Sequence, residues 1–189
     1  KCGGYDSDVI AGMRWAVGLP VPGGATNPTP AKILNMSLSG EGACGAAYHA
    51  VISEVVARGA SVVIAAGNAA GHAVGTPANC PGVIAVAGRR HAGTKVGFSS
   101  LGPEVAISAP GGNCINVEAG QPCLFPILTA SNTGKQGPEQ PTYSDAYNAT
   151  VGTSFSTPLV SGTIALMLSV RPTLTAAEVR DTLRGSAHT

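Results

Sequence analysis

Ser154 stands where a chain could place a nucleophile. It follows Gly152 and Thr153 and precedes an apolar run whose spacing is typical of a helix. At the start of a helix, unpaired backbone N–H groups and the helix dipole stabilise negative charge, as a developing oxyanion requires. Gly152 would also allow a substrate carbonyl to approach closely. The alternative is that Ser154 or Thr153 only caps the helix, because serine and threonine are preferred there.

Asn68 is the second residue that could take part in such chemistry. It follows residues 60–67, a run of small and β-branched residues that predicts a buried strand. An asparagine amide at the carboxyl end of a parallel strand can donate to an oxyanion, and losing one such donor costs about 2.7–4 kcal/mol of transition-state stabilisation. Taken alone, the Gly67-Asn68 step is better explained as a turn, because Gly-Asn pairs commonly interrupt regular structure. The functional interpretation therefore depends on Asn68 and Ser154 acting together.

Alternating strand and helix patterns must position these two residues. Strand, helix, strand in that order predicts right-handed crossovers and a parallel α/β sheet. A glycine- and proline-rich stretch at 111–150 interrupts the alternation. The expected helices are 7–18, 45–59, 156–170 and 173–187, and the expected strands are 31–38, 60–67, 82–88, 105–111 and two short ones near 124–129 and 142–150.

Capping residues predict where several helices begin and end. Thr175 and Glu178 have the spacing of a capping box at the start of the last helix. The helix at 156–170 is apolar on nearly every side, which predicts burial all round. Other expected ends are Ser7 or Asp8 as the first cap, and Gly59 and Gly185 as terminating glycines.

Composition indicates one domain with a large interior. Charged residues make up only 11% of the 189 residues, whereas about a quarter is usual. Aromatic residues are only 4%, so the core must consist of small aliphatic side chains, as in a tightly packed parallel sheet. The net charge of +1 gives no reason to expect a nucleic acid or an acidic membrane as partner. No window approaches the roughly 20 apolar residues of a membrane span.

The five cysteines favour disulfides in a secreted protein with one thiol left over. No CxxC pair is present, which argues against a zinc site. Cys114 and Cys123 bracket a short loop and form the favoured pair, with Cys2–Cys44 second. Spacing alone leaves the connectivity open.

Four segments together resemble the subtilisin-like serine proteases, or subtilases. GTSFSTPLVSG resembles their nucleophile segment, and AAGN resembles their oxyanion-hole segment. NMSLSG and FSSLGPEVAISAPG resemble their cleft strand and a later strand-and-turn. The resemblance covers nearly the whole chain, so residues 1–189 are expected to form a single domain with a three-layer subtilisin-like α/β fold.

The resemblance implies a role for each matching residue. Ser154 would be the nucleophile of a secreted endopeptidase, with its own N–H and the Asn68 side chain as oxyanion donors. Ser39 departs from the glycine that the family usually has, which would narrow the cleft slightly. The residues implied in substrate binding, partly by pairing with an extended peptide as an added strand, are Ser37, Leu38, Ser39, Ala65, Ala66, Gly67 and Thr153.

A subtilase also needs an aspartate and a histidine that precede the serine. Neither family segment occurs here, since no histidine is followed by Gly-Thr-His. Residues 1–189 are therefore expected to be the C-terminal part of a catalytic domain, without its N-terminal strands and nearly inactive alone. Its partners would be peptide substrates and either the missing N-terminal segment or further copies of itself, covering the edge of the strand at 31–38. Calcium is possible, but no metal-binding residue is assigned.

Three alternatives remain at this stage. The chain could be an inactive subtilase relative that binds extended peptides or a partner chain. An α/β-hydrolase would need Gly-x-Ser-x-Gly, and GTSFS lacks the second glycine. A nucleotide-binding domain would need Gly-x-Gly-x-x-Gly, which GNAAGHAVG does not contain.

Overall fold

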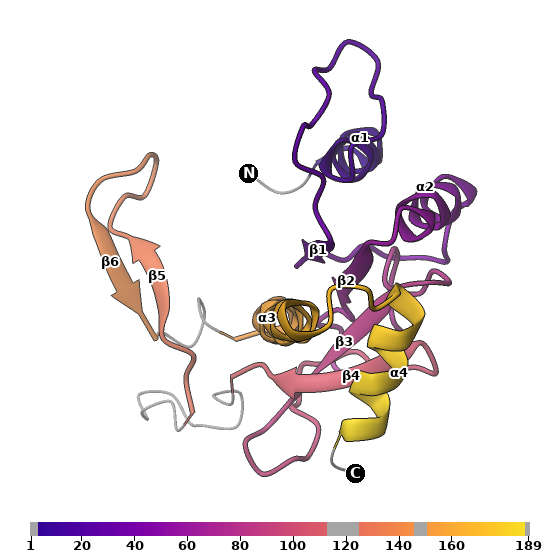
Figure 1. Cartoon of the computed structure of the whole chain (residues 1–189). Helices are drawn as coiled ribbons and strands as arrows, with labels where there is room; N and C mark the ends of the chain where they lie inside the picture. Colours follow the sequence, from indigo (N-terminus) through magenta and orange to yellow (C-terminus); the bar gives the residue numbers. More distant parts are fainter. Residues whose placement is uncertain (1–3, 113–124, 146–150, 188–189) are drawn as a thin grey trace.

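The computed structural model describes residues 4–112, 125–145 and 151–187 of the chain. These residues form a central parallel sheet, four helices that pack against it or against each other, and a separate hairpin (Figure 1). The elements are α1 (Asp6–Ala16), β1 (Ile33–Met36), α2 (Ala46–Ala57), β2 (Ser61–Ala65), β3 (Ile84–Arg89), β4 (Val105–Pro110), β5 (Thr129–Asn132), β6 (Pro141–Ser144), α3 (Thr153–Val170) and α4 (Ala176–Ser186).

The sheet has the order β1-β2-β3-β4, and every neighbouring pair is parallel. Every residue of β2 is buried, as expected for a central strand whose two faces are both covered by helices. This explains why residues 62–65 of the strand are all apolar and do not alternate with polar residues. All four carboxyl ends consequently lie at one edge of the sheet.

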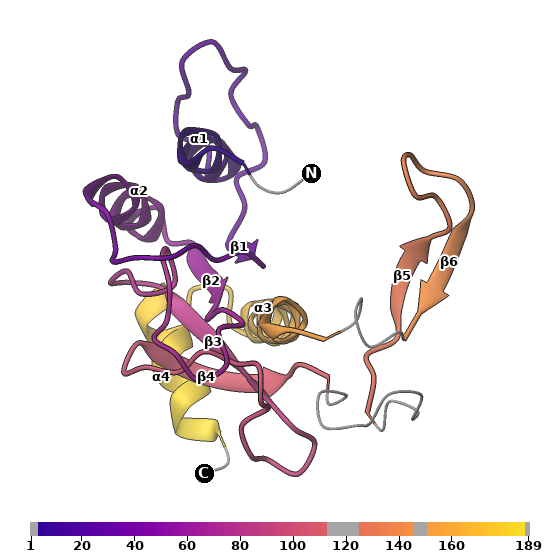
Figure 2. The same cartoon turned by 180° about the vertical axis from the view of Figure 1, so that it is seen from behind.

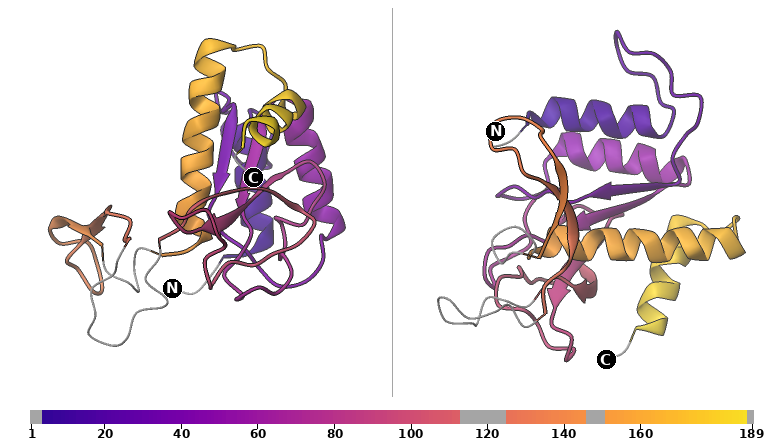
Figure 3. Two further views of the ribbon diagram at one scale, coloured as in Figure 1. Left: turned by 90° about the horizontal axis from the view of Figure 1, so that it is seen from below. Right: turned by 90° about the vertical axis from the view of Figure 1, so that its left-hand side faces the viewer.

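Helices cover both faces of the sheet and complete three layers (Figure 3). On one face, α1 and α2 form a core with the strands that contains Met13, Ile52 and Val55. On the other face, α3 and α4 form a second core that contains Ile164 and Val179. The prediction of a layered parallel α/β fold is confirmed.

The hairpin of β5 and β6 stands apart from the layered body in both opposite views (Figures 1 and 2). Thr129 pairs with Ser144 at one end and Asn132 pairs with Pro141 at the other. The strand expected near 124–129 meets β5 only at Thr129, so its bounds are wrong. The strand expected at 142–150 overlaps β6, and residues 146–150 lie outside the described residues.

The predicted helix ends are partly right. The Thr175–Glu178 capping box is present, and Gly59 ends α2 with a φ of +80°. The predicted cap of α1 is wrong, because the helix begins earlier and Tyr5 occupies the cap position without a side-chain bond. The prediction for Gly185 is also wrong, since α4 continues to Ser186.

The outer face of α3 corrects the expectation that this helix is buried all round. Val160 and Ile164 are buried against the sheet, but Leu166 is 71% exposed and Val170 is 79% exposed. With 18 residues and a mean hydropathy of 1.3, α3 is long and apolar enough to cross a membrane, judged by length and composition alone. It nevertheless packs along the sheet as a core helix. The uniform apolar pattern could not reveal that only one face is covered in this chain.

A disulfide joins Cys44 to Cys80, so the predicted Cys2–Cys44 pair is wrong. The backbone bridge between Gly40 and Thr76 brings their two loops together. The Cα atoms of Cys44 and Cys80 are consequently 5.0 Å apart, although 36 positions separate them. The other predicted pair, Cys114–Cys123, lies outside the described residues.

The contact between Tyr48 and Asp6 predicts a loss of stability at alkaline pH. The Tyr48 hydroxyl donates to Asp6 Oδ1 at 2.9 Å and joins α2 to α1. Burial, followed by the hydrogen bond and the charge of Asp6, raises the pKa of Tyr48 from 10.0 to about 12. The folded protein thus retains the proton more firmly than the unfolded chain, and this stabilisation is complete below about pH 10 and lost as pH rises to about 12.

Urea unfolding between pH 9 and pH 12 tests this expectation, and we expect a decline that Tyr48→Phe makes shallower. Tyr143→Phe is the matched control, because Tyr143 is 75% exposed. An equally steep decline in Tyr48→Phe would contradict the assignment.

Candidate active site

The end of β2 and the start of α3 meet at the carboxyl edge of the sheet. In parallel sheets this edge is where ligands bind, because the loops that follow the strands gather there. Asn68 lies three residues beyond the end of β2, and Ser154 is the second residue of α3. The fold thus brings together the two residues that the sequence singled out.

Thr153 fixes the orientation of the Asn68 side chain. Asn68 Oδ1 accepts two hydrogen bonds from Thr153, at 2.9 Å from the backbone N–H and at 3.0 Å from Oγ1. Since both donors hold the oxygen, the amide group must present Nδ2 on its other side. No acceptor occupies that Nδ2 among the described residues, which leaves it available to a ligand.

The turn before α3 accepts only glycine at position 152. Gly152 has a φ of +146°, which residues with a side chain rarely adopt. A Cβ there would lie 3.2 Å from Asn68 Nδ2. On the other side of the contact, the Gly67 N–H donates to Thr153 Oγ1 at 3.2 Å. Asn68 is therefore held between the end of its own strand and the first turn of α3.

Ser154 is held against the residue that follows β1. Ser37 Oγ donates to the Ser154 carbonyl at 2.8 Å, and Ser154 Oγ donates to the Ser37 carbonyl at 3.3 Å. Asn35 extends this contact, because its Nδ2 donates to Ser37 Oγ and its Oδ1 accepts from Ser161 of α3. The backbone N–H of Ser154 lies in the first helical turn and has no intrahelical acceptor.

No imidazole accepts from the Ser154 hydroxyl within the described part of the chain. His49, His72 and His91 are all exposed there, and His188 lies outside the described residues. The ring of His91 instead stacks on Phe125, with centroids 3.4 Å apart. His72 borders the same cavity as Asn68 but has no hydrogen bond to Ser154. Within the described residues, no histidine is therefore placed to act as a general base for Ser154.

A cavity of about 890 Å³ adjoins Asn68. Ser39 and Gly67 border it, while Ser37 and Leu38 lie exposed just beyond β1, and a substrate-binding role for these four residues stays a prediction. Ala65 and Ala66 are buried and do not line the cavity, so a substrate-binding role for them stays a prediction. The sequence did not single out the further lining residues Glu41, Asn79, Ser100 and Glu104. These residues lie far apart in the chain and become neighbours only when their loops fold together.

Comparison with known proteins identifies the family. A family model described as the subtilase family matches residues 1–189. This chain belongs to the subtilase family. Among curated relatives, it is similar to an extracellular protease of Xanthomonas campestris, with 41% identity over 99% of this chain and 30% of that protein. It is also 37% identical to an extracellular basic protease of Dichelobacter nodosus, over 97% of this chain and 28% of that protein.

Solved protease structures agree with the observed fold. The match to a protease from Pseudoalteromonas arctica has a TM-score of 0.91 at 33% identity and covers 100% of this chain and 54% of that chain. A cold-adapted subtilisin-like serine proteinase matches with a TM-score of 0.70 at 26% identity, over 98% of this chain and 56% of that one. This subtilase chain thus spans about half the length of these structures.

Within residues 4–112, 125–145 and 151–187, no group of three or more His, Cys, Asp or Glu side chains is placed to hold a metal ion. The possibility of calcium stays an untested expectation.

Replacing Thr153 tests whether this residue holds the site together. Thr153→Val removes the Oγ1 bond to Asn68 and leaves the buried Gly67 N–H without an acceptor, which should cost about 1–3 kcal/mol in unfolding free energy. Thr153→Ser keeps the hydroxyl and serves as the matched control. Urea unfolding of both variants measures the difference, and a Thr153→Val variant as stable as the Thr153→Ser variant would contradict the role of the hydroxyl.

Proposed function

We propose that this chain provides the nucleophile and oxyanion hole of a secreted serine endopeptidase. The single observation that supports this most directly is the orientation of Asn68, whose Oδ1 is bound by Thr153 while its Nδ2 stays available beside Ser154. A fixed amide donor stabilises a developing negative charge without reorganising during the reaction.

Secretion is supported by relatives named extracellular proteases and by the Cys44–Cys80 disulfide.

In the proposed reaction, Ser154 Oγ attacks the carbonyl carbon of the scissile peptide bond and gives its proton to a general base. The oxyanion that forms accepts hydrogen bonds from Asn68 Nδ2 and from the Ser154 N–H. Collapse of this intermediate breaks the C–N bond, and the leaving amine takes the proton from the base. Water then attacks the Ser154 ester by the same route and releases the acid, which restores the hydroxyl.

An extended peptide would bind along the residues that follow β1. Ser37, Leu38 and Ser39 are exposed and directly follow that strand in the chain. Their backbone groups can pair with a peptide as an added strand, which gives affinity with little dependence on sequence. This arrangement would place the scissile carbonyl between β1 and the start of α3, where Ser154 contacts Ser37.

We further propose that another segment of the same protease covers β1 and α3 and supplies the catalytic histidine and aspartate. One side of β1 has no strand partner in the described sheet, and an apolar groove of about 490 Å³ lies between β1 and α1. The outer side of α3, the helix that begins with Thr153 and Ser154, exposes the apolar residues Leu166 and Val170. Open edges and apolar faces of this kind favour association with further chain. By itself, this chain would have little or no activity.

The oligomeric state of the 189-residue chain tests this second proposal. We expect that, produced alone, it associates with itself or aggregates, because no other protein covers β1 and α3. Sedimentation velocity at micromolar concentration measures this. A monodisperse, folded monomer would contradict the proposal that these surfaces require a covering segment.

A non-catalytic peptide-binding role is the second candidate. The observation that favours it is the Ser154 hydroxyl, which donates to the Ser37 carbonyl and not to an imidazole. A peptide phosphonate that labels activated serines separates the two functions. Labelling of the complete protease at Ser154 supports the endopeptidase, whereas peptide binding without labelling supports the alternative.

Asn68→Ala tests the proposed mechanism. Loss of one oxyanion donor should lower kcat about 10²–10³-fold with little change in KM, because this bond forms only in the transition state. Ser154→Ala should abolish both hydrolysis and labelling. Ser169→Ala is the control on the same helix, since its hydroxyl is exposed and bonds only the Leu166 carbonyl of α3. An Asn68→Ala enzyme with normal kcat would contradict the role of this residue.

A further inference from the structure

The cavity beside Asn68 is where the side chain of the attacked residue must go, if the proposed endopeptidase mechanism holds. This residue contributes the acyl group and is called the acyl residue here. In the proposed reaction, the carbonyl oxygen of the acyl residue lies at Asn68 Nδ2 and its carbonyl carbon lies at Ser154 Oγ. The side chain of the acyl residue starts at the Cα atom, one bond from that carbonyl carbon, and so must lie close to Asn68. The space that adjoins Asn68 is the cavity of about 890 Å³.

Among the described residues, two carboxylates and no lysine or arginine border this cavity. Glu41 and Glu104 come from loops that lie more than 60 positions apart in the sequence. The ion pairs within the described residues are Arg14–Glu54 and Arg180–Asp181, so neither glutamate is neutralised by a cation there. The remaining lining residues are Ser39, Gly40, Gly42, Ala43, Gly67, Asn68, Ala69, His72, Ala73, Val74, Gly75, Asn79 and Ser100.

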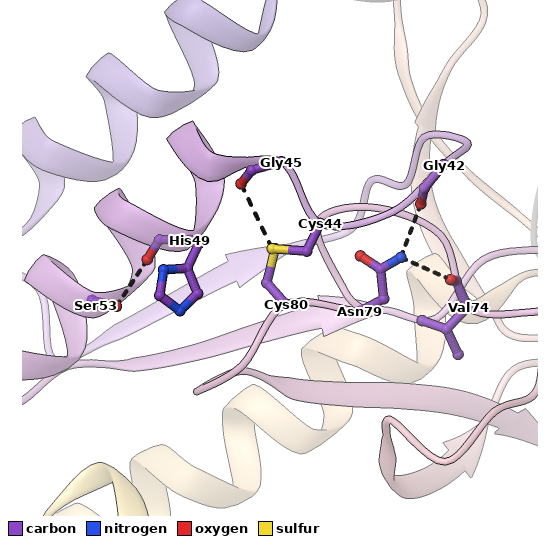
Figure 4. Close-up of a disulfide and its surroundings, with 8 residues drawn as sticks. All are labelled: Gly42, Cys44, Gly45, His49, Ser53, Val74, Asn79 and Cys80. Carbon is purple, nitrogen blue, oxygen red and sulfur yellow. Dashed lines mark hydrogen bonds between the residues drawn. A yellow bond between two sulfur atoms is a disulfide. The ribbon is translucent and has the colours of Figure 1, made fainter.

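The wall that carries Glu41 is fixed on both sides of that residue. Before it, the Gly40 N–H donates to the Thr76 carbonyl at 2.7 Å. After it, Asn79 Nδ2 donates to the Gly42 carbonyl at 2.9 Å, and the Cys44–Cys80 disulfide follows (Figure 4). Figure 4 shows the Asn79 side chain beside the Cys44–Cys80 disulfide, and both join the loop that carries Glu41 to the loop that carries Cys80. The Glu41 side chain therefore starts from a backbone position that is held firmly.

Glu104 is anchored in a similar way. The Leu101 N–H donates to the His72 carbonyl at 2.9 Å, and the Val105 N–H donates to the Gly102 carbonyl at 3.2 Å. This turn leads directly into β4. The Glu104 carboxylate lies so close over Gly102 that a Cβ at Gly102 would collide with it.

The rest of the cavity suits a long side chain. Ala43, Ala73 and Val74 offer small apolar surface along its walls. Gly75 adds no side chain, because a Cβ there would collide with the Gly40 carbonyl. An aliphatic stem can lie along such walls while a charged head reaches the carboxylates, as lysine and arginine side chains do. A large apolar side chain would instead remove water from two carboxylates without replacing their hydrogen bonds.

We propose that this cavity selects lysine or arginine as the acyl residue, with Glu41 and Glu104 as the residues that determine the specificity. This proposal rests on the endopeptidase function. The cationic head accepts no hydrogen bonds and donates several, which complements carboxylates that only accept.

The test uses the complete protease and a set of chromogenic tetrapeptide anilides that differ only in the acyl residue. Lysine and norleucine form the key pair, because their stems match and only lysine carries a charge. We expect kcat/KM for the lysine substrate to exceed that for norleucine at least 10-fold, with arginine close to lysine. Glu41→Gln and Glu104→Gln should each reduce this ratio about 10-fold, mainly through KM. Glu139→Gln in the β5–β6 hairpin is the control, since Glu139 does not line the cavity.

The possible results separate this inference from the proposed function. Hydrolysis of none of the substrates, together with no phosphonate labelling, overturns the endopeptidase itself. Hydrolysis in which norleucine or phenylalanine equals or exceeds lysine overturns only the specificity. If a glutamine variant fails to fold, the salt dependence of the unmodified enzyme decides, because a charge-based preference must weaken as salt is raised towards 1 M. A lysine preference that does not change with salt would contradict the role of the two glutamates.

Discussion

The hydrogen bonds from Thr153 to the side-chain oxygen of Asn68 are the constraint on which the rest of the site depends. They join the loop after β2 to the first turn of α3, two elements that are 85 positions apart. Because Thr153 donates twice to one oxygen, the amide has a single orientation, and its nitrogen faces the space beside Ser154. The Gly67 N–H completes the contact by donating to Thr153 Oγ1, and Gly152 leaves room for it.

The layered sheet makes this contact possible. Parallel strands end at one edge, so β1 supplies Ser37, β2 supplies Asn68, and α3 enters between them with Ser154. The buried strands fix the positions of these ends, and α3 is held by Val160 and Ile164 in the core beneath. The loops carry the chemistry, while the sheet and helices supply the rigidity that an oxyanion hole needs. The Cys44–Cys80 disulfide adds rigidity where a loop wall would otherwise depend on a few hydrogen bonds.

Much of the fold followed from local patterns, because apolar runs and capping residues report directly on strands and helices. The sequence also predicted that Asn68 and Ser154 belong together. It did not predict the partner of Cys44, since the Gly40–Thr76 pairing that brings Cys80 near has no local signal. The one-sided burial of α3 was missed as well, because an apolar pattern shows which faces can be covered but not which are. Glu41 and Glu104 gather around the cavity only after the loops fold.

The most direct test of this account is a crystal structure of the complete protease with a peptide phosphonate bound to Ser154. The phosphoryl oxygen then stands where the oxyanion would form. We predict that it lies about 3 Å from Asn68 Nδ2 and from the Ser154 N–H, a normal hydrogen-bond length, while Asn68 Oδ1 still accepts from Thr153. A structure in which the Asn68 amide has turned away from Thr153, or in which its nitrogen does not reach the phosphoryl oxygen, would contradict the central claim.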